Sequence, residues 1–138
     1  MFLGKKTNIV TNEIMINTLS SLLIEGETLQ TPIYAICERR GRQKYNGFCF
    51  VGTTETALLY ARLNIPATLI EWTTRISLEE IKEIKIKKSL FANYIIIKIA
   101  FNDGNFIHIR SSTKAFTGGF VNQEIHLLCF IERLSAMI

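Results

Sequence analysis

Residues 47–62, GFCFVGTTETALLYAR, contain the pattern that most constrains how this chain can fold. Two short apolar runs, at 48–51 and 57–60, flank a polar break of glycine, threonine and glutamate at 52–56. Short apolar runs on either side of turn-forming residues are typical of a β-hairpin whose strands are both largely buried. The stretch holds no nucleophile, base or ligand set, so it predicts architecture and not chemistry.

Strand-like segments recur on both sides of this hairpin. Pro32 predicts that the first strand has an edge position or a bulge, because proline cannot donate a ladder hydrogen bond. Ile70, Trp72 and Ile76 alternate with polar residues, which predicts a strand with one buried and one solvated face. Asn102-Asp103-Gly104 is the strongest hairpin signal in the chain. We expect seven strands, at 28–37, 45–52, 56–62, 68–76, around 84–87, 93–101 and 105–111.

Helical periodicity lies on both sides of the β-rich region. Residues 12–25 repeat apolar side chains at helical spacing, with Thr11 or Asn12 available as the N-cap. Gly26 can adopt the left-handed conformation that ends a helix. Residues 120–137 repeat apolar side chains over a broad helical face. We therefore expect one helix before the strands and a longer one after them.

Seven strands followed by a terminal helix predict one mainly β domain. A curled antiparallel sheet leaves hydrophobic openings and exposed edges, and a terminal amphipathic helix can cover one opening. The expected fold is a seven-stranded antiparallel β-sandwich or partly open barrel, capped by a C-terminal α-helix, with an extra N-terminal helix. Residues 1–138 form a single domain, with helices at about 12–25 and 120–137 and a β region at about 27–113.

Composition argues against several protein classes. The chain is 48% hydrophobic and 20% charged, which fits a globular protein and not a disordered one. No apolar run approaches the roughly 18 residues of a membrane span. We expect a cytoplasmic protein without a transmembrane segment, with peripheral contact at the inner membrane surface as the alternative. Cys37, Cys49 and Cys129 lie far apart in apolar contexts, which predicts buried free thiols and no metal site.

Catalytic and cofactor motifs are absent from the sequence. It contains no GxSxG, HExxH, P-loop or GxGxxG pattern. The two histidines, His108 and His126, have no aspartate or cysteine at metal-ligand spacing. We therefore expect no enzymatic activity and no cofactor.

The order of several short phrases resembles one known family. Residues 23–27, LIEGE, are similar to an LxxGE phrase before a first strand. Residues 47–60 are similar to a G-φ-φ-φ-T-x-x-R-L-φ-φ hairpin, where φ is apolar, and residues 76–84 to an I-x-φ-x-x-I-x-x-I turn. With the Asn-Asp-Gly turn and the terminal helix, they make most of residues 23–137 resemble bacterial pleckstrin-homology-like (PH-like) domains of the YokE type and, more distantly, GRAM domains. Ala57 stands where this pattern often has arginine.

This resemblance implies a non-enzymatic binding or scaffold module. Its partner would be another protein, or a second copy in self-assembly. The free sheet edge or the wide face of the last helix is the expected contact, with Phe130, Met137 and Ile138 on the helix. Lys85 and Lys87 alternate with isoleucine, as in an edge strand protected against aggregation. Exposed aromatics or a recognition helix, which nucleic-acid surfaces use, are not evident.

A cationic segment between the first two strands is the candidate ligand site. Arg39, Arg40, Arg42 and Lys44 would lie in the loop where, by the resemblance, lipid-binding PH domains hold phosphoinositide head groups. No basic residue lies between positions 30 and 37, so the upstream lysine of that motif is missing. At roughly 1 kcal/mol per basic residue, four supply about 4 kcal/mol, a dissociation constant of roughly millimolar. Weak binding to anionic lipid head groups is the alternative function, and a solvated loop without a ligand is the other interpretation.

Overall fold

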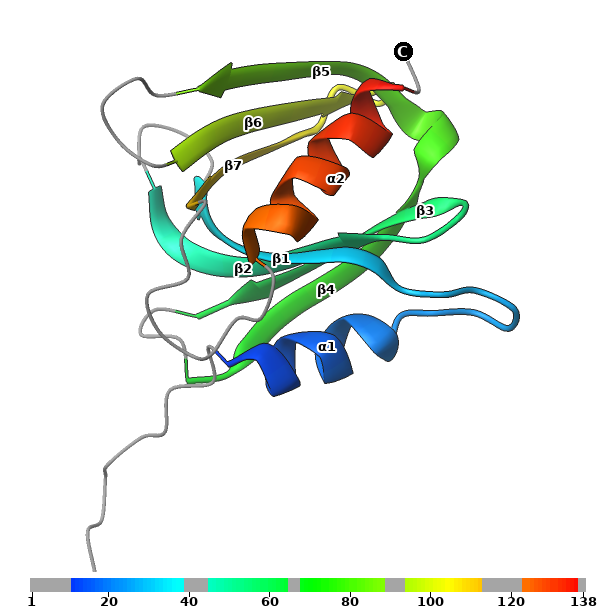
Figure 1. The fold of residues 1–138 in the computed structure, drawn as a ribbon, viewed down its shortest axis with the longest axis vertical. Coiled ribbons are helices and arrows are strands. Elements are labelled where there is room, and N and C mark those ends of the chain that lie inside the picture. Colours follow the sequence, from blue (N-terminus) through cyan, green and yellow to red (C-terminus); the bar gives the residue numbers. More distant parts are fainter. Residues whose placement is uncertain (1–10, 39–44, 65–67, 89–93, 113–122, 137–138) are drawn as a thin grey trace, which may run out of the picture.

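The computed structural model describes residues 11–38, 45–64, 68–88, 94–112 and 123–136. Within these ranges the chain forms a mainly β fold with one helix before the strands and one after them, as the sequence predicted (Figure 1). The elements are α1 (Asn12–Ser20), β1 (Gln30–Glu38), β2 (Tyr45–Thr53), β3 (Ala57–Leu63), β4 (Ile70–Ser77), the 3-10 turn η1 (Leu78–Glu80), β5 (Ile81–Lys88), β6 (Tyr94–Phe101), β7 (Phe106–Ser112) and α2 (Gln123–Ser135).

The seven strands form one antiparallel sheet in the order β4-β3-β2-β1-β7-β6-β5. β4 and β5 are neighbours along the chain, yet they lie at opposite edges of the sheet and do not pair with each other. The sheet is therefore curled without closing into a barrel. Figure 1 shows it curving around α2, while α1 lies outside the curve.

Both faces of the central strands are buried, which explains the apolar run at 57–60. Leu58 and Tyr60 of β3 belong to the concave core, which α2 covers. Leu59 and Ala61 point to the opposite face and belong to a second cluster that α1 covers. A strand covered on both faces has no solvated face, so its sequence shows no polar alternation.

The first residue of α2 joins the helix to the sheet. β1 and β7 pair over only two residue pairs, and the buried side chain of Gln123 lies next to this short ladder. Its Oε1 accepts a hydrogen bond from the Tyr34 N–H (3.2 Å), and its Nε2 donates to the carbonyl oxygens of Tyr34 (3.0 Å) and Ser112 (3.2 Å). Nε2 also donates to Ser111 Oγ (2.9 Å). The side-chain amide thus bonds to backbone groups of both strands where the direct ladder is short.

The N-terminal helix is shorter than the predicted 12–25. Thr11 is the N-cap, one of the two predicted candidates, but α1 ends after nine residues. Gly26 has the expected positive φ of 86°. It lies in a separate turn, in which the Glu27 N–H donates to the Ile24 carbonyl oxygen. Gly26 therefore shapes the connection to β1 and does not end the helix.

The expected apolar face of the last helix is divided between core and surface. Leu127, Phe130 and Leu134 are fully buried, whereas Ile125 is 59% exposed and Leu128 is 49% exposed. Phe130 was expected at the margin of the face and available for partner contact, but it lies inside the core because α2 presents this stripe to the curved sheet.

The predicted burial of β4 is wrong for Ile70, whereas Trp72, which the sequence placed in the core or at its rim, lies at the rim. Ile76 packs against the concave core, as expected. Ile70 and Trp72 are instead 37% and 49% exposed. β4 is an edge strand, and its register against β3 shifts between Arg62 and Leu63, so this half of the strand extends beyond the core.

Candidate functional site

A groove of about 300 Å³ lies between strands β3 and β4 and the β6–β7 hairpin. We call it the β4 groove. Trp72 and Phe106, two of its lining residues, are aromatic side chains that remain about half exposed. No residue of α2 contributes to it, so it is the part of the concave side that the helix leaves uncovered. The groove is lined by Tyr60, Arg62, Trp72, Thr74, Ile76, Glu80, Phe101, Asp103, Asn105, Phe106, Ile107 and His108.

Trp72 contacts two neighbours, Tyr60 and Arg62. The Tyr60 ring meets it edge-on, with ring centroids 5.7 Å apart. The guanidinium carbon of Arg62 lies 5.6 Å from the Trp72 ring centroid, within the range of a cation–π contact. The Nε of Arg62 is also 3.2 Å from Glu71 Oε1, so its charge is partly neutralised. These contacts orient Trp72 as a fixed apolar wall of the groove.

The β4 groove carries charges of both signs. Arg62 brings a cation, Glu80 and Asp103 bring carboxylates, and His108 is half-buried in the wall. Such a mixture does not favour a strongly charged ligand of either sign. Apolar and polar residues contribute equally to the lining, which suits a protein side chain or a small amphipathic molecule.

Two cysteine thiols lie in the core beside the groove wall. Cys37 and Cys49 are buried, as predicted. A hydrogen bond from the Cys49 thiol lowers the pKa of Cys37 to about 7, and the Tyr60 hydroxyl and the Arg62 charge act in the same direction. Burial, followed by the interaction with Cys37, raises the pKa of Cys49, and burial raises that of Tyr60. Reactive cysteines need access to solvent, so this pair is a polar contact inside the core and not an exposed nucleophile.

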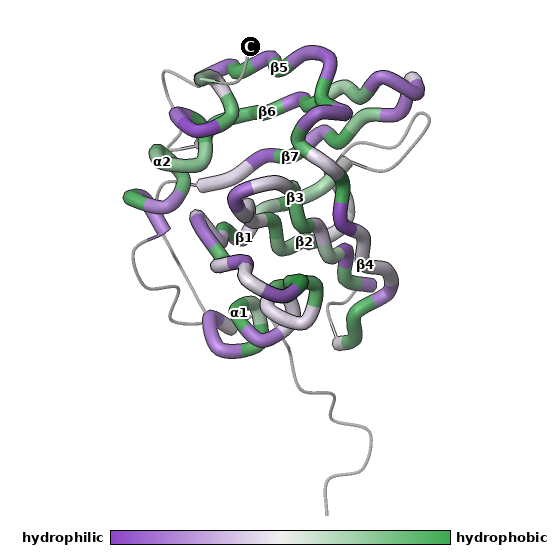
Figure 2. Tube along the Cα trace, turned by 90° about the vertical axis from the view of Figure 1, so that its right-hand side faces the viewer, coloured by the Kyte–Doolittle hydropathy of each residue, from purple (hydrophilic) through white to green (hydrophobic). Residues whose placement is uncertain are grey.

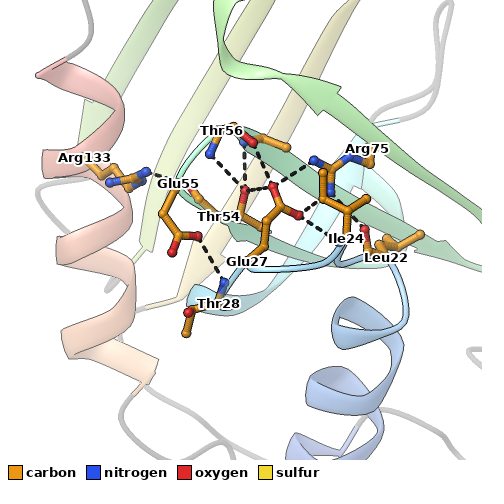
Figure 3. Close-up of polar contacts among 10 residues, drawn as sticks. Leu22, Ile24, Glu27, Thr28, Thr54, Glu55, Thr56, Arg75 and Arg133 are labelled. Atoms are coloured by element: carbon orange, nitrogen blue, oxygen red, sulfur yellow. Dashed lines mark hydrogen bonds and ion pairs between the residues drawn. The ribbon is translucent and has the colours of Figure 1, made fainter.

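A carboxylate network joins the segment after α1 to the sheet (Figure 3). Both oxygens of Glu27 accept hydrogen bonds from Arg75, at 2.6 and 2.8 Å. The hydroxyl groups of Thr54 and Thr56 donate to Oε2 at 2.9 and 2.7 Å, and the Ile24 N–H donates to Oε1 at 3.0 Å. These donors, Arg75 first, hold the pKa of Glu27 far below its usual 4.5. The carboxylate is saturated by bonds within the domain, which indicates a structural role.

A second hollow, of about 490 Å³, lies at the C-terminal end of α2. Two of its three charged side chains bond to the domain's own backbone: Arg133 Nη2 donates to the Thr54 carbonyl oxygen (2.5 Å), and Glu55 Oε1 accepts from the Thr28 N–H (3.1 Å). They are less suited to hold a ligand than the walls of the β4 groove. Its lining residues are Gln30, Thr31, Glu55, Leu78, Cys129, Glu132, Arg133 and Ala136.

The β1 segment beside this hollow contains the predicted irregularity. The β1–β2 register shifts between Gln30 and Ile33, on either side of Pro32, as the proline predicted. Thr31 has a φ of +47°, which a β-branched residue rarely adopts. Its Oγ1 lies 2.9 Å from the Thr53 Oγ1, and this contact helps to hold the bulge.

All four residues of the predicted cationic site lie outside the described part of the chain. Arg39, Arg40, Arg42 and Lys44 belong to residues 39–44, which the structure does not describe.

The predicted protein-contact residues are only partly described. Met137 and Ile138 likewise fall outside the described residues. Lys85 and Lys87 are exposed on β5, which is an edge strand, as predicted. They do not line the β4 groove. The third cysteine, Cys129, is exposed on α2, contrary to the expected burial.

Two further features concern metals and membranes. Among the described residues, no group of three or more histidine, cysteine, aspartate and glutamate side chains is placed to hold a metal ion. Neither of the helices in the described ranges is long and apolar enough to cross a membrane.

The sequence did not point to the β4 groove. Trp72, Phe106 and Arg62 are separated along the chain and come together because the sheet curls and leaves one corner uncovered. The one usable signal was that Trp72, the single tryptophan, lies in a strand beside charged residues. Its pattern predicted a place in the core or at the rim of the core, and did not indicate a groove.

Comparison with known proteins supports the fold and goes no further. No protein-family model matches the sequence, and no curated protein matches it either. Among solved structures, the hSac2 domain from the human phosphoinositide phosphatase Sac2 aligns with a TM-score of 0.60 at 14% identity, covering 91% of this chain and 79% of that one. The C-terminal domain of an unknown protein from Leishmania infantum aligns with a TM-score of 0.56 at 16% identity, covering 89% of this chain and 96% of that one. At these identities the likeness concerns the β-sandwich fold alone.

Proposed function

We propose that this chain is a non-enzymatic PH-like binding module whose partners are proteins, bound at the β4 groove and the adjoining edge of β4. The observation that carries this proposal is the half-exposed ring of Trp72, which contacts Tyr60 and Arg62 in the wall of the β4 groove at the edge of the sheet. Exposed, pre-oriented aromatic side chains are enriched at the centres of protein interfaces. The strand and helix order, the PH-like resemblance of the sequence and the β-sandwich neighbours all support a binding scaffold.

The β4 groove fits one large side chain of a partner. Its volume of about 300 Å³ lies at the lower end of typical ligand sites, which span roughly 300–1,000 Å³. The apolar surfaces of Trp72, Ile76 and Phe101 can contact an apolar or aromatic group. Arg62 and Asp103 at the same site can bond to polar atoms next to that group. Anchoring of this kind provides specificity through one buried side chain.

A peptide-display selection on the purified protein tests the proposal. We expect peptides that bind the wild-type protein and lose at least about tenfold in affinity to Trp72→Ala, since a truncated central aromatic costs about 2 kcal/mol or more. Ile125→Ala is the matched control, because Ile125 is also an exposed apolar residue but lies on α2. The emission of Trp72, the single tryptophan, reports binding directly.

Two results would refute this function. A selection that returns no binder, or only binders indifferent to Trp72→Ala, removes the groove as a protein site. The lipid alternative is tested in parallel by flotation with anionic vesicles, comparing the wild-type protein with charge reversal of Arg39, Arg40, Arg42 and Lys44. Vesicle binding that depends on those residues, without groove-dependent peptides, would make anionic lipid the ligand class.

A further inference from the structure

The two edge strands of the sheet, β5 and β4, differ in how readily another strand can pair with them. β5 carries Lys82, Lys85, Lys87 and Lys88, and Figure 2 shows hydrophilic and hydrophobic residues alternating along it. Alternating lysines oppose the addition of another strand, because each brings a charge that must be desolvated. β5 is thus a protected edge.

β4 lacks this protection between Trp72 and Ser77. Its only charged residue in that stretch is Arg75, which is bound to Glu27 of its own chain. The neighbouring Glu71, at the register shift, is ion-paired to Arg62. The stretch contains no proline or glycine and is rich in β-branched and aromatic residues. Within the described chain β4 pairs only with β3, so its outer edge is open.

We propose that the β4 strands of two copies of this chain pair antiparallel across a twofold axis at Thr74. This inference rests on the proposed function and names its partner: a second copy. The β4 edge is short, its one charged residue between Trp72 and Ser77 is ion-paired within its own chain, and exposed apolar side chains flank it. A strand with the same sequence is therefore chemically matched to it. A symmetric contact of this type closes after two copies and does not propagate into a fibre.

The backbone pattern determines which residues can make the bonds. The Leu78 N–H donates to the Thr56 carbonyl oxygen at the end of the β3–β4 ladder. Bonding alternates along an antiparallel strand, so Ile76, Thr74 and Trp72 bond inward to β3 over the regular register. The N–H and C=O groups of the residues between them, such as Thr73 and Arg75, therefore point to the open edge.

Symmetry and charge then select the register. A twofold axis normal to the sheet places one residue opposite its own copy, and Thr73, Thr74 and Arg75 are the central candidates. An axis at Arg75 would bring two guanidinium groups together, and directly opposed like charges are unfavourable. An axis at Thr73 brings Arg75 opposite position 71, where the strand is irregular.

The axis at Thr74 satisfies both the backbone and the side chains. Thr73 then exchanges backbone hydrogen bonds with Arg75 of the second copy, and symmetry repeats the exchange. On the groove side, Trp72 lies directly opposite Ile76 of the second copy in a close pair without hydrogen bonds. Aromatic–β-branched cross-strand pairs each add roughly 0.2–1 kcal/mol. Trp72, which is 49% exposed in the single chain, is partly covered by this contact.

The contact is small, so the dimer is weak. One strand per chain, Trp72 to Ser77, buries less than the about 800 Å² per partner of a standard interface. We therefore expect a monomer in dilute solution and a growing dimer fraction as the protein concentration rises. Trp72 emission should shift to shorter wavelength over the same concentration range, because the ring leaves water.

Single-cysteine cross-linking tests the register. Thr73→Cys, Thr74→Cys and Arg75→Cys are each introduced into a Cys129→Ser background, which removes the exposed native thiol. Lys85→Cys on β5 is the control for random collision. A residue on the axis faces its own copy with Cα atoms about 4.5 Å apart, within the range that a disulfide spans.

We expect Thr74→Cys to form disulfide-linked dimers at least about tenfold faster than the other three variants, because the paired thiols have a high effective concentration. Equal rates at Thr74→Cys and Lys85→Cys would overturn the proposal, as would a maximum at Thr73→Cys or Arg75→Cys. Concentration-independent Trp72 emission in the unmodified protein would also overturn it, and that measurement does not depend on any variant folding.

The outcomes separate this inference from the proposed function. Peptides that require Trp72, together with no preferential cross-link at Thr74→Cys, would leave the groove as a protein site and remove the second copy as its partner. Preferential cross-linking at Thr74→Cys without any groove-dependent peptide would support self-association and remove the binding of other proteins.

Discussion

Replacing Gln123 tests how the helix and the two halves of the sheet are joined. The side chain is 4% exposed and bonds to four atoms: Oε1 accepts from one N–H, and the two N–H groups of Nε2 are shared among three acceptors. A typical bond contributes about 0.5–1.5 kcal/mol net, and the two of 3.2 Å are at the weak end. Tyr34 O keeps a second donor, Ser111 Oγ at 2.7 Å, after the change. Gln123→Ala should therefore lower the free energy of unfolding by about 2–4 kcal/mol.

Gln123→Glu is the more specific test, because it keeps the shape of the side chain and replaces the donating NH2 group by an accepting oxygen. An ionised carboxylate accepts but cannot donate, so it would face the carbonyl oxygens of Tyr34 and Ser112 across distances now occupied by N–H donors. A buried carboxylate without a counter-charge costs several kcal/mol, even though the Tyr34 N–H can still donate to it, so Gln123→Glu should be at least as unstable as Gln123→Ala. The same environment raises the carboxyl pKa above its unfolded value of about 4.3. The deficit relative to wild type should therefore shrink as pH falls through the raised pKa.

Chemical and thermal denaturation measure these changes. For a domain of this size, about 3 kcal/mol corresponds to a fall in Tm of roughly 10 °C. Glu124→Ala is the matched control, since the adjacent side chain is exposed and should change stability by less than about 1 kcal/mol. A Gln123→Glu protein as stable as the wild type at pH 7 would refute the assigned hydrogen bonds.

Three further predictions concern other parts of the domain. The pKa of Glu27 is lowered in the folded protein, so its carboxylate stabilises the fold at pH values above the unfolded pKa near 4.5, and this stabilisation is lost as the pH falls below that value. Glu27→Gln or Arg75→Met should therefore flatten the acid side of the stability–pH curve. A curve identical to that of the wild type would contradict this prediction. Phe130→Ala should cost about 3–5 kcal/mol in denaturation, whereas Ile125→Ala on the exposed side of α2 should cost less than about 0.5 kcal/mol. Thiol titration of the native protein should show one fast group, Cys129, and two slow ones, and three equal rates would show that the core is open.

Local sequence patterns were sufficient to predict the order of the helices and strands. The buried hairpin at residues 47–62, the Asn-Asp-Gly turn and the short turn after Ser77 each depend on residues close in sequence, and each is confirmed. Ser77 caps that turn by accepting a hydrogen bond from the Glu79 N–H. The lysine alternation at 85–87 also identified an edge strand, because the position of a strand in a sheet affects which residues it tolerates.

Side-chain burial at the margins of the fold could not be predicted in the same way. Periodicity places Ile125 and Leu128 on the apolar face of the last helix, yet the curved sheet accepts only the stripe through Leu127 and Phe130. How wide a face of a helix is buried depends on how far its neighbours extend around it. Here the width of the buried face is a property of the sheet and not of the helical period. For the same reason the sequence left open whether Trp72 lies in the core or at its rim, and the structure leaves its side chain half exposed.

The sequence by itself determined that this is one mainly β domain with two covering helices, because turns, caps and apolar alternation are local signals. The β4 groove, the carboxylate network of Glu27 and the insertion of Gln123 beside β1 and β7 were decided only by tertiary structure. Each brings together residues from separate elements, and no local period records which distant side chains will meet. Among the described strands β4 has an unpaired outer edge, and this edge depends on both: the residues of β4 set what it can bind, and the strand order places it at the margin of the sheet.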